Sequence, residues 1–325
     1  MSSTANVTIH QSQFPENVRR DLLESLRTRK VNHKFHYDSV KQTQKWLTLH
    51  QRHSPSRNDA DCAATYDRAF AEAVSRIETD RVHVFGLGCG GGQKDTRLVK
   101  LLCDRSADVS YTPCDVSTAM VLTARQSALA ILPEKKCFPL VCDLATAHDL
   151  PDVLATRHPP LATRLITFFG MIPNFEPGEI LPKLASLVRE QDWLLFSANL
   201  APGADFAAGV QHVLPQYDNA LTCEWLLAFL LDLGMEREDG ELRFSVEDSA
   251  GLKRIVARFH FAHARRIELE GDAFEFRAGE TIQLFFSYRY TPERVSAALA
   301  EQGLKVCGQW ITKSEEEGVF FCRRA

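Results

Sequence analysis

A glycine-dense turn gives the strongest chemical signal in this sequence. It lies within residues 82–100, VHVFGLGCGGGQKDTRLVK, where an apolar run ends in the turn and a helix-like pattern follows directly. Glycine adopts positive φ freely and has no Cβ, so a ligand can approach the main chain closely. The first N–H groups of the following helix point toward the same space without intrahelical partners. The turn therefore predicts a site for a nucleotide-like small molecule.

Two cofactor classes fit this turn. Gly86, Gly88 and Gly91 match the GxGxxG pattern of dinucleotide sites, and Asp115, which ends an apolar strand-like run, lies near the position of the acidic residue that binds the adenosine ribose there. A further strand-end acid, Asp143 in PLVCDL, favours S-adenosyl-L-methionine instead, because such a site uses one strand-end carboxylate for the ribose and the next for the adenine. NAD and a turn without a nucleotide stay as alternatives.

The composition is that of an ordinary globular chain. Its 325 residues are 45% hydrophobic, with a formal charge of -4 and a pI near 6.3. Basic clusters are no longer than short pairs, which gives no reason to expect a nucleic-acid partner or an anionic membrane. No apolar stretch reaches the length of a bilayer span, and the first residues lack the apolar core of a secretory signal. We expect a soluble, cytoplasmic monomer that binds a small-molecule substrate.

The cysteines and histidines do not indicate a metal site. The nine cysteines form no CxxC pair and no Cys/His ligand spacing, and most lie in apolar segments, as buried thiols in a reducing compartment do. Four histidines, His33, His36, His50 and His53, cluster near the N-terminus without the spacing or the carboxylates of a metal shell. We therefore expect no metal.

The order of the elements that must position the turn indicates an α/β fold. Between residues 81 and 200, near-continuous apolar strands alternate with helices, which is typical of a parallel sheet covered on both faces. The chain ends in a helix, PERVSAALAEQG, and two strands, LKVCGQWIT and EGVFFCRR, as a Rossmann-like class I methyltransferase sheet ends in an antiparallel pair. The intervening region contains an apolar helix, CEWLLAFLLDLG, and alternating runs such as RIVARFHF that predict antiparallel strands.

The expected domain organisation has three parts. An N-terminal part of helices, with helical patterns at 15–29 and 60–77, includes an aromatic and polar segment that contacts substrate and donor. A methyltransferase core follows, and an α+β substrate-binding lid is inserted into it. The expected bounds are 1–80 for the N-terminal part, 81–200 with 291–325 for the core, and 201–290 for the lid.

Seven short motifs, in order along nearly the whole chain, give it a resemblance to a known family. They are KFHYD, SPSR, GLGCGGGQK, PCDVS, FFGMIPN, LPQYDN and SYRYTPE. Together they resemble the histidine-specific Nα-methyltransferases, the S-adenosylmethionine enzymes that form the histidine betaine of ergothioneine biosynthesis. The resemblance implies N-methylation of an amino acid, with S-adenosyl-L-homocysteine as the other product.

By position, the resemblance implies roles for individual residues. The donor would contact the following residues: Gly88, Gly90, Lys94, Asp115 and Asp143. Asp115 would bind the ribose and Asp143 would lie beside the adenine, while Gly86 stands where the family has an acidic residue. The substrate's α-amine would contact Tyr37 and Asn174, and its carboxylate would contact Asn174 and Tyr217. Gly170, in the FFGMIPN loop, belongs to the same substrate site.

The side-chain pocket departs from the family pattern. Ser54, Phe285 and Ala257 stand where the histidine enzymes bind the imidazole with a tyrosine and a glutamate beside a methionine, while the serine matched by Ser287 is retained. An imidazole N–H left unpaired in a buried site would cost about 1–3 kcal/mol. We therefore expect a different side chain on the substrate, with histidine as the alternative.

The chemistry itself requires little from the protein. Methyl transfer is an in-line displacement by a neutral amine on a sulfonium, so alignment and exclusion of water matter most. A phenol or carboxamide oxygen can orient the amine lone pair, and Tyr37 and Asn174 are the candidates. Each also has a structural interpretation, Tyr37 as an aromatic core residue and Asn174 as a helix cap. A protein that binds S-adenosylmethionine without turnover is the alternative from another class.

Overall fold

An eight-stranded sheet forms the largest element of the computed structural model, which describes residues 4–105, 107–155, 162–269 and 271–325. The strand order is β1-β4-β3-β2-β5-β6-β13-β12. Neighbours pair in parallel up to β6, and β13 and β12 follow as antiparallel neighbours. The strands are β1 (Thr8–Ile9), β2 (Arg81–Leu87), β3 (Asp108–Asp115), β4 (Leu140–Val141), β5 (Thr163–Phe168), β6 (Trp193–Asn199), β12 (Leu304–Ile311) and β13 (Glu317–Arg324). The predicted α/β fold with an antiparallel end is confirmed.

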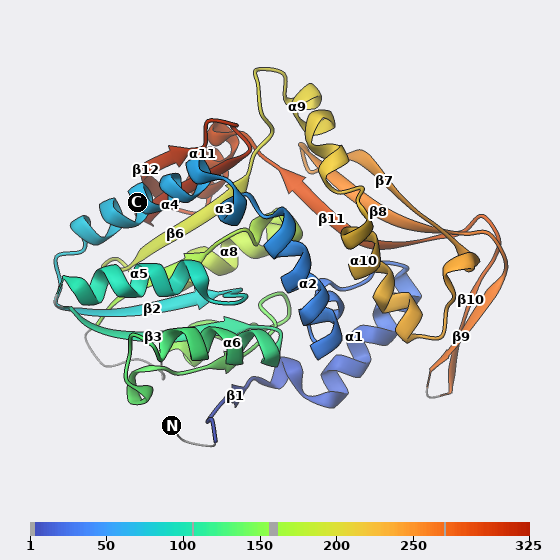
Figure 1. Cartoon of the computed structure of the whole chain (residues 1–325), viewed down its shortest axis with the longest axis horizontal. Helices are drawn as coiled ribbons and strands as arrows, with labels where there is room; N and C mark the ends of the chain where they lie inside the picture. The colour runs from blue at the N-terminus through green and yellow to red at the C-terminus, as the bar shows by residue number, and fades with distance from the viewer. Residues whose placement is uncertain (1–3, 106, 156–161, 270) are drawn as a thin grey trace.

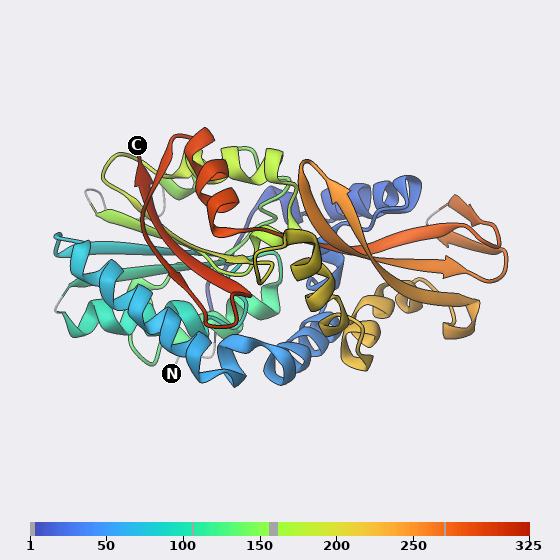
Figure 2. The ribbon, with the colours of Figure 1, turned by 90° about the horizontal axis from the view of Figure 1, so that it is seen from above.

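Helices cover this sheet on both faces, as the continuous apolar strands predict (Figure 2). In β2, Val82 and Val84 pack in one core cluster and Phe85 and Leu87 in the other, because successive side chains of a strand point to opposite faces. The helices of the core are α4 (Ala60–Arg76), α5 (Gln93–Asp104), α6 (Thr118–Ala128), α7 (Leu150–Ala155), α8 (Pro177–Leu187) and α11 (Pro292–Glu301). The glycine-dense turn joins β2 to α5, as the sequence predicts.

The lid contains a separate antiparallel sheet of order β11-β8-β7 and a two-stranded hairpin of β9 and β10. Its apolar face packs on Trp225 and Phe229 of the lid helix α10 and on Leu26 of the N-terminal helix α1. Figure 1 shows this unit beside the core sheet, with α2 (Val40–His53) between them and the N-terminal helix α1 (Pro15–Thr28) along the lid. The lid elements are α9 (Phe206–Val213), α10 (Ala220–Asp232), β7 (Gly240–Ser249), β8 (Leu252–Phe261), β9 (Arg265–Leu269), β10 (Asp272–Phe276) and β11 (Thr281–Arg289).

The N-terminal segment connects the core with the lid. Strand β1 adds a parallel strand to the core sheet beside β4, which the sequence did not predict. The chain then passes through α1 (Pro15–Thr28) and, three residues after this helix, Val31 N donates to Gln283 O of β11 at 2.9 Å. It continues into α2 (Val40–His53) and α3 (Pro55–Asn58). Across the described ranges, no helix combines the length and apolar character that a membrane crossing requires.

Candidate active site

A cavity of about 850 Å³ is lined by residues from the core, the N-terminal segment and the lid. On the core side it borders the glycine turn after β2 and the ends of β3 and β4, and on the other side it borders α2 and the lid strand β11. All but one of the site residues predicted from the sequence line it: Tyr37, Ser54, Gly88, Gly90, Lys94, Asp115, Asp143, Gly170, Asn174, Tyr217, Phe285 and Ser287. The exception is Ala257.

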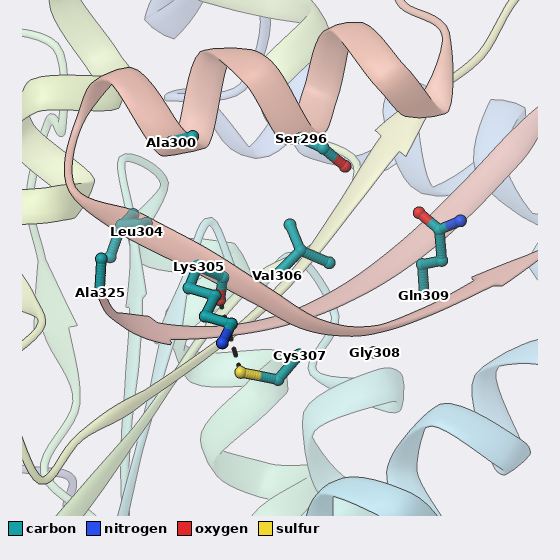
Figure 3. A pocket seen from close by; sticks show the side chains of 9 residues that line it. All are labelled: Ser296, Ala300, Leu304, Lys305, Val306, Cys307, Gly308, Gln309 and Ala325. Carbon is teal, nitrogen blue, oxygen red and sulfur yellow. Dashed lines mark hydrogen bonds between the residues drawn. The ribbon is translucent and has the colours of Figure 1, made fainter.

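A second hollow, of about 620 Å³, lies at the edge of the core sheet between α11 and β12 (Figure 3). No acidic residue or histidine is in its lining, and Cys307 Sγ lies 3.6 Å from the Lys305 carbonyl oxygen there. None of the predicted site residues borders this hollow, so the candidate active site is the larger cavity.

The glycine turn keeps the main chain open toward the larger cavity. Gly88 and Gly90 have φ of +64° and +52°, a region that disfavours side chains. A Cβ on Gly88 would lie 2.6 Å from the Met171 side chain, and one on Gly90 would lie 3.2 Å from the ring of Trp46. Met171 and Trp46 therefore lie close to the turn on either side, and a side chain at Gly88 or Gly90 would fill the space that remains in front of the main chain.

Two buried carboxylates stand at the strand ends on the same side of the sheet. Asp115 accepts hydrogen bonds from the main-chain N–H groups of Gly90 and Ser117, each at 3.0 Å, and burial raises its pKa to about 6. Asp143 accepts from Ala145 N at 2.9 Å and from Thr146 Oγ1 at 3.0 Å. Both carboxylates thus stabilise their own turns while they line the cavity.

Lys94, in the first turn of α5, makes polar contacts with other side chains of the protein. Its Nζ donates to the Tyr66 hydroxyl at 2.7 Å and lies 3.7 Å from Glu317 Oε1. Tyr66 in turn donates to Ser197 Oγ at 2.9 Å, and Ser197 Oγ accepts from Gly170 N at 2.8 Å. The lysine therefore lies in a polar network that includes the Gly170 loop, so its charge is partly neutralised before any ligand binds.

Asn174 and Tyr37 present polar groups toward the substrate part of the cavity. Asn174 Nδ2 donates to the Phe286 carbonyl at 2.8 Å, which fixes the amide orientation and leaves Oδ1 without a partner among the described residues. The Tyr37 ring lies between Trp46 and Trp225, at centroid distances of 6.0 and 5.4 Å. Burial raises the pKa of its phenol, so the hydroxyl is protonated and can donate.

The side-chain part of the cavity is aromatic. The Phe285 ring lies 6.0 Å from Tyr217, 5.8 Å from Trp225 and 5.5 Å from His33, as measured between centroids. Burial lowers the pKa of His33 to about 3, so this imidazole is neutral. Aromatic rings, and not a carboxylate, surround the position where the resemblance places an imidazole acceptor.

Two of the predicted pocket residues, Ala257 and Ser54, lie in different surroundings. Ala257 pairs with Phe285 across β8 and β11 but is fully buried in the lid core and lies outside the cavity lining, so the expected substrate contact is not found there. Ser54 Oγ lies 2.9 Å from Ser56 Oγ at the lining. Ser54 and Phe285 thus line the cavity at positions where the resemblance places imidazole contacts, while Ala257 packs behind Phe285.

The family model of histidine-specific, S-adenosylmethionine-dependent methyltransferases matches residues 18–324. The chain belongs to this family. A histidine N-alpha-methyltransferase of Mycolicibacterium smegmatis is 25% identical over 319 residues, 94% of each chain. An N-methyltransferase, imqF, of Aspergillus flavus is 23% identical over 273 residues, 82% of this chain and 72% of the relative. The protein is thus an S-adenosylmethionine-dependent N-methyltransferase.

Among solved structures, an S-adenosylmethionine-dependent methyltransferase from Clostridium acetobutylicum ATCC 824 matches with a TM-score of 0.47 at 13% identity. The match covers 87% of this chain and 98% of that one. A likeness this partial says nothing about substrate.

Several residues of the methyltransferase site were not foreseen from the sequence. Lys34, with 3% of its surface exposed, lies between Asp21 at 2.5 Å and Asp143 at 3.6 Å. Trp46 faces the glycine turn and stacks on His50 at a centroid distance of 4.7 Å. Arg289 lines the cavity. The sequence could have indicated this position, because Phe285, Ser287 and Arg289 are every second residue of β11 and therefore share one face of the strand.

Proposed function

We propose that this methyltransferase N-methylates the α-amino group of a small amino acid, or of an amino-acid-like amine, whose side chain is not an imidazole. One observation supports the proposal most. A single cavity of about 850 Å³ borders both the candidate donor residues of the core and the candidate amine and carboxylate contacts of the N-terminal segment and lid. A nucleoside donor and an amino acid can therefore lie next to each other in one cavity, so that the methyl group passes directly from donor to amine.

The donor end of the cavity fits S-adenosylmethionine. The glycine turn leaves its main chain accessible because Gly88 and Gly90 have positive φ and no Cβ. The buried carboxylate of Asp115 can accept hydrogen bonds from ribose hydroxyls, and Asp143 lies at the neighbouring strand end for the adenine. When bound, S-adenosylmethionine supplies an electrophilic methyl group on a sulfonium.

The substrate end can orient a neutral amine. Asn174 Oδ1 is free to accept an amine N–H because Nδ2 is already bonded to the Phe286 carbonyl. The Tyr37 hydroxyl lies at the same lining, and its raised pKa keeps it a neutral hydrogen-bond partner. These two contacts direct the lone pair toward the donor end, and the proton that the amine loses passes to solvent.

The pocket around Phe285 favours an apolar or aromatic side chain. His33, Tyr217 and Trp225 surround this ring, and none offers the charged acceptor that an imidazole N–H needs. His33 is neutral, and its ring can offer a substrate N–H only an uncharged nitrogen. Without a charged acceptor, histidine would lose about 1–3 kcal/mol, or roughly 5- to 150-fold in kcat/KM. Histidine is the second candidate because curated relatives are histidine N-alpha-methyltransferases.

The test is a turnover screen of the purified full chain. S-adenosylmethionine is incubated with each standard amino acid and with simple amines, and both S-adenosylhomocysteine release and the mass of the methylated amine are measured. We expect N-methylated products from amino acids with apolar or aromatic side chains and weaker turnover of histidine. Asn17→Ala, whose side chain is bonded to Gln11 and Arg20 outside the cavity, is the control for Asn174→Ala.

Two results would contradict the proposal in different ways. If histidine is methylated faster than every other amino acid, the substrate part is wrong. If the donor binds and no amine accepts a methyl group, the protein binds S-adenosylmethionine for another purpose.

A further inference from the structure

Arg289 is a buried cation at the cavity that has no carboxylate partner among the residues that the structure describes. It ends β11, only 3% of its surface is exposed, and it lines the cavity. Its Nη2 donates to the Tyr217 hydroxyl at 2.7 Å and its Nη1 donates to the Leu200 carbonyl at 3.1 Å. Its Nε is buried without a partner, and no Asp or Glu of the described residues lies within ion-pair distance.

This arrangement is unusual for a guanidinium. Arginine stays charged in proteins, and a buried charge without a counter-ion is strongly unfavourable, so buried arginines are normally paired with carboxylates. The other partly buried arginines of the lid strands follow that rule: Arg254 pairs with Glu176 at 3.1 Å, and Arg258 pairs with Glu247. Arg289 differs because its neighbours are a phenol and a carbonyl. The missing anion is therefore expected to come from a ligand.

Arg289 also determines what the Tyr217 hydroxyl can do. A guanidinium has only donors, so the Tyr217 oxygen must accept the 2.7 Å hydrogen bond. The hydroxyl proton of Tyr217 is then directed either to Ser287 Oγ, 2.9 Å away, or to a bound group. Tyr217 thus becomes a donor toward the cavity with a positive charge directly behind it, which suits an anionic oxygen.

We infer that Arg289 makes this methyltransferase specific for amines that carry a free carboxylate, with Arg289 as the charge behind the Tyr217 hydroxyl. The inference rests on the proposed function and narrows its substrate class to zwitterionic amino acids, as opposed to amides, esters and simple amines. The amine lies at Tyr37 and Asn174, and the carboxylate lies at Tyr217 in front of Arg289. Loss of the guanidinium removes the charge and also frees the Tyr217 hydroxyl to rotate.

The experiment compares acids with their amides. L-alanine, L-leucine and L-phenylalanine are each paired with their carboxamides, and KM and kcat are measured for the wild type, Arg289→Gln, Arg289→Lys and Arg258→Gln. We expect the wild type to favour the acid over the amide by about 10- to 100-fold in KM, the range of a charge-assisted hydrogen bond. Arg289→Gln should reduce that preference to a few fold, Arg289→Lys should retain part of it, and Arg258→Gln, outside the cavity, should match the wild type.

Thermal stabilisation by the same pairs, in the presence of S-adenosylhomocysteine, measures carboxylate binding independently of turnover. Equal stabilisation by acid and amide in the wild type would overturn the inference. So would an Arg289→Gln variant that loses both ligands alike, because that pattern belongs to a purely structural arginine. If acids stabilise the protein but no amine is methylated, the carboxylate site stands and the proposed function fails.

Discussion

Asp115 makes donor binding sensitive to mild acid. Burial raises the pKa of this carboxyl to about 6 from an ordinary value of 3.8, even though two main-chain N–H groups donate to it. A ribose hydroxyl donates most strongly to the ionised form, in which both carboxylate oxygens accept, whereas protonation converts one of these oxygens into a donor. A pKa that is higher by about 2 corresponds to a net penalty of roughly 3 kcal/mol on the ionised form of the Asp115 carboxyl.

The raised pKa of Asp115 predicts that affinity for the donor falls as the pH falls. Above pH 6 the carboxylate is ionised and affinity is at its plateau, while below pH 6 a growing fraction of Asp115 is protonated and binds the ribose more weakly. The apparent Kd should therefore rise as the pH falls, by up to about 10-fold between pH 8 and pH 5. Tyr37 and Cys89 do not contribute to this change, because burial raises their pKa values and keeps both neutral throughout. Asp95, which also lines the cavity, has its pKa raised by burial to about 6 and must be tested separately.

Isothermal titration calorimetry with 5′-methylthioadenosine is the suitable assay, since this nucleoside has the ribose and adenine but no amino-acid charges. Asp115→Asn should bind more weakly at pH 8 and lose the pH dependence. Asp95→Asn tests the other carboxyl of the cavity lining whose pKa burial raises to about 6, and to whose carboxylate Tyr111 and Thr167 donate at 2.8 and 2.7 Å. This variant should keep the pH dependence of the wild type. A wild-type Kd that stays constant from pH 8 to pH 5 would refute the ribose role of Asp115.

Three further substitutions test other parts of the site. Asn174→Ala should lower kcat/KM by about 100-fold through lost alignment, and a donor Kd that rises in parallel would argue against a substrate contact. Phe285→Glu should raise kcat/KM for histidine by about 10-fold relative to Phe285→Gln, since it restores a charged acceptor; no gain would contradict the pocket interpretation. Gly86→Ala should cost about 1–3 kcal/mol of unfolding free energy by urea denaturation, as overpacking does, because its Cβ would lie 2.0 Å from Asp95 Oδ2. Gly178→Ala in α8, with open space around it, is its control and should be neutral or stabilising.

Much of the fold could be predicted from the sequence because periodicity reports burial. The helices expected at 15–29 and 60–77 correspond to Pro15–Thr28 and Ala60–Arg76, and the closing antiparallel strands lie at the expected segments. Strand β1 was missed because two residues are too few to show a period, and only its pairing with β4 identifies it. The helix α2 was hidden by its mixture of aromatic and polar residues, which face a cavity and not a uniform core.

The candidate site was predictable only in part. The sequence order of motifs located residues that line one cavity, since strand ends of a parallel sheet converge at one edge. It could not reveal which polar groups already have partners. The interaction of Lys94 with Tyr66 and Glu317, and the lack of a carboxylate near Arg289, depend on side chains that are distant in sequence. Such pairings follow from packing, which no local pattern encodes.

At the glycine turn, the space beside Gly86 is occupied by the side chain of another residue. Gly86 stands where the resemblance places an acidic residue, and the space that its side chain would fill is taken by the carboxylate of Asp95 from α5. That carboxylate lies at the cavity lining and accepts from Tyr111 and Thr167. The acidic group is thus present near the turn but comes from the helix. Because the two positions exclude each other sterically, a side chain at residue 86 requires the loss or displacement of Asp95, and the pair must be varied together.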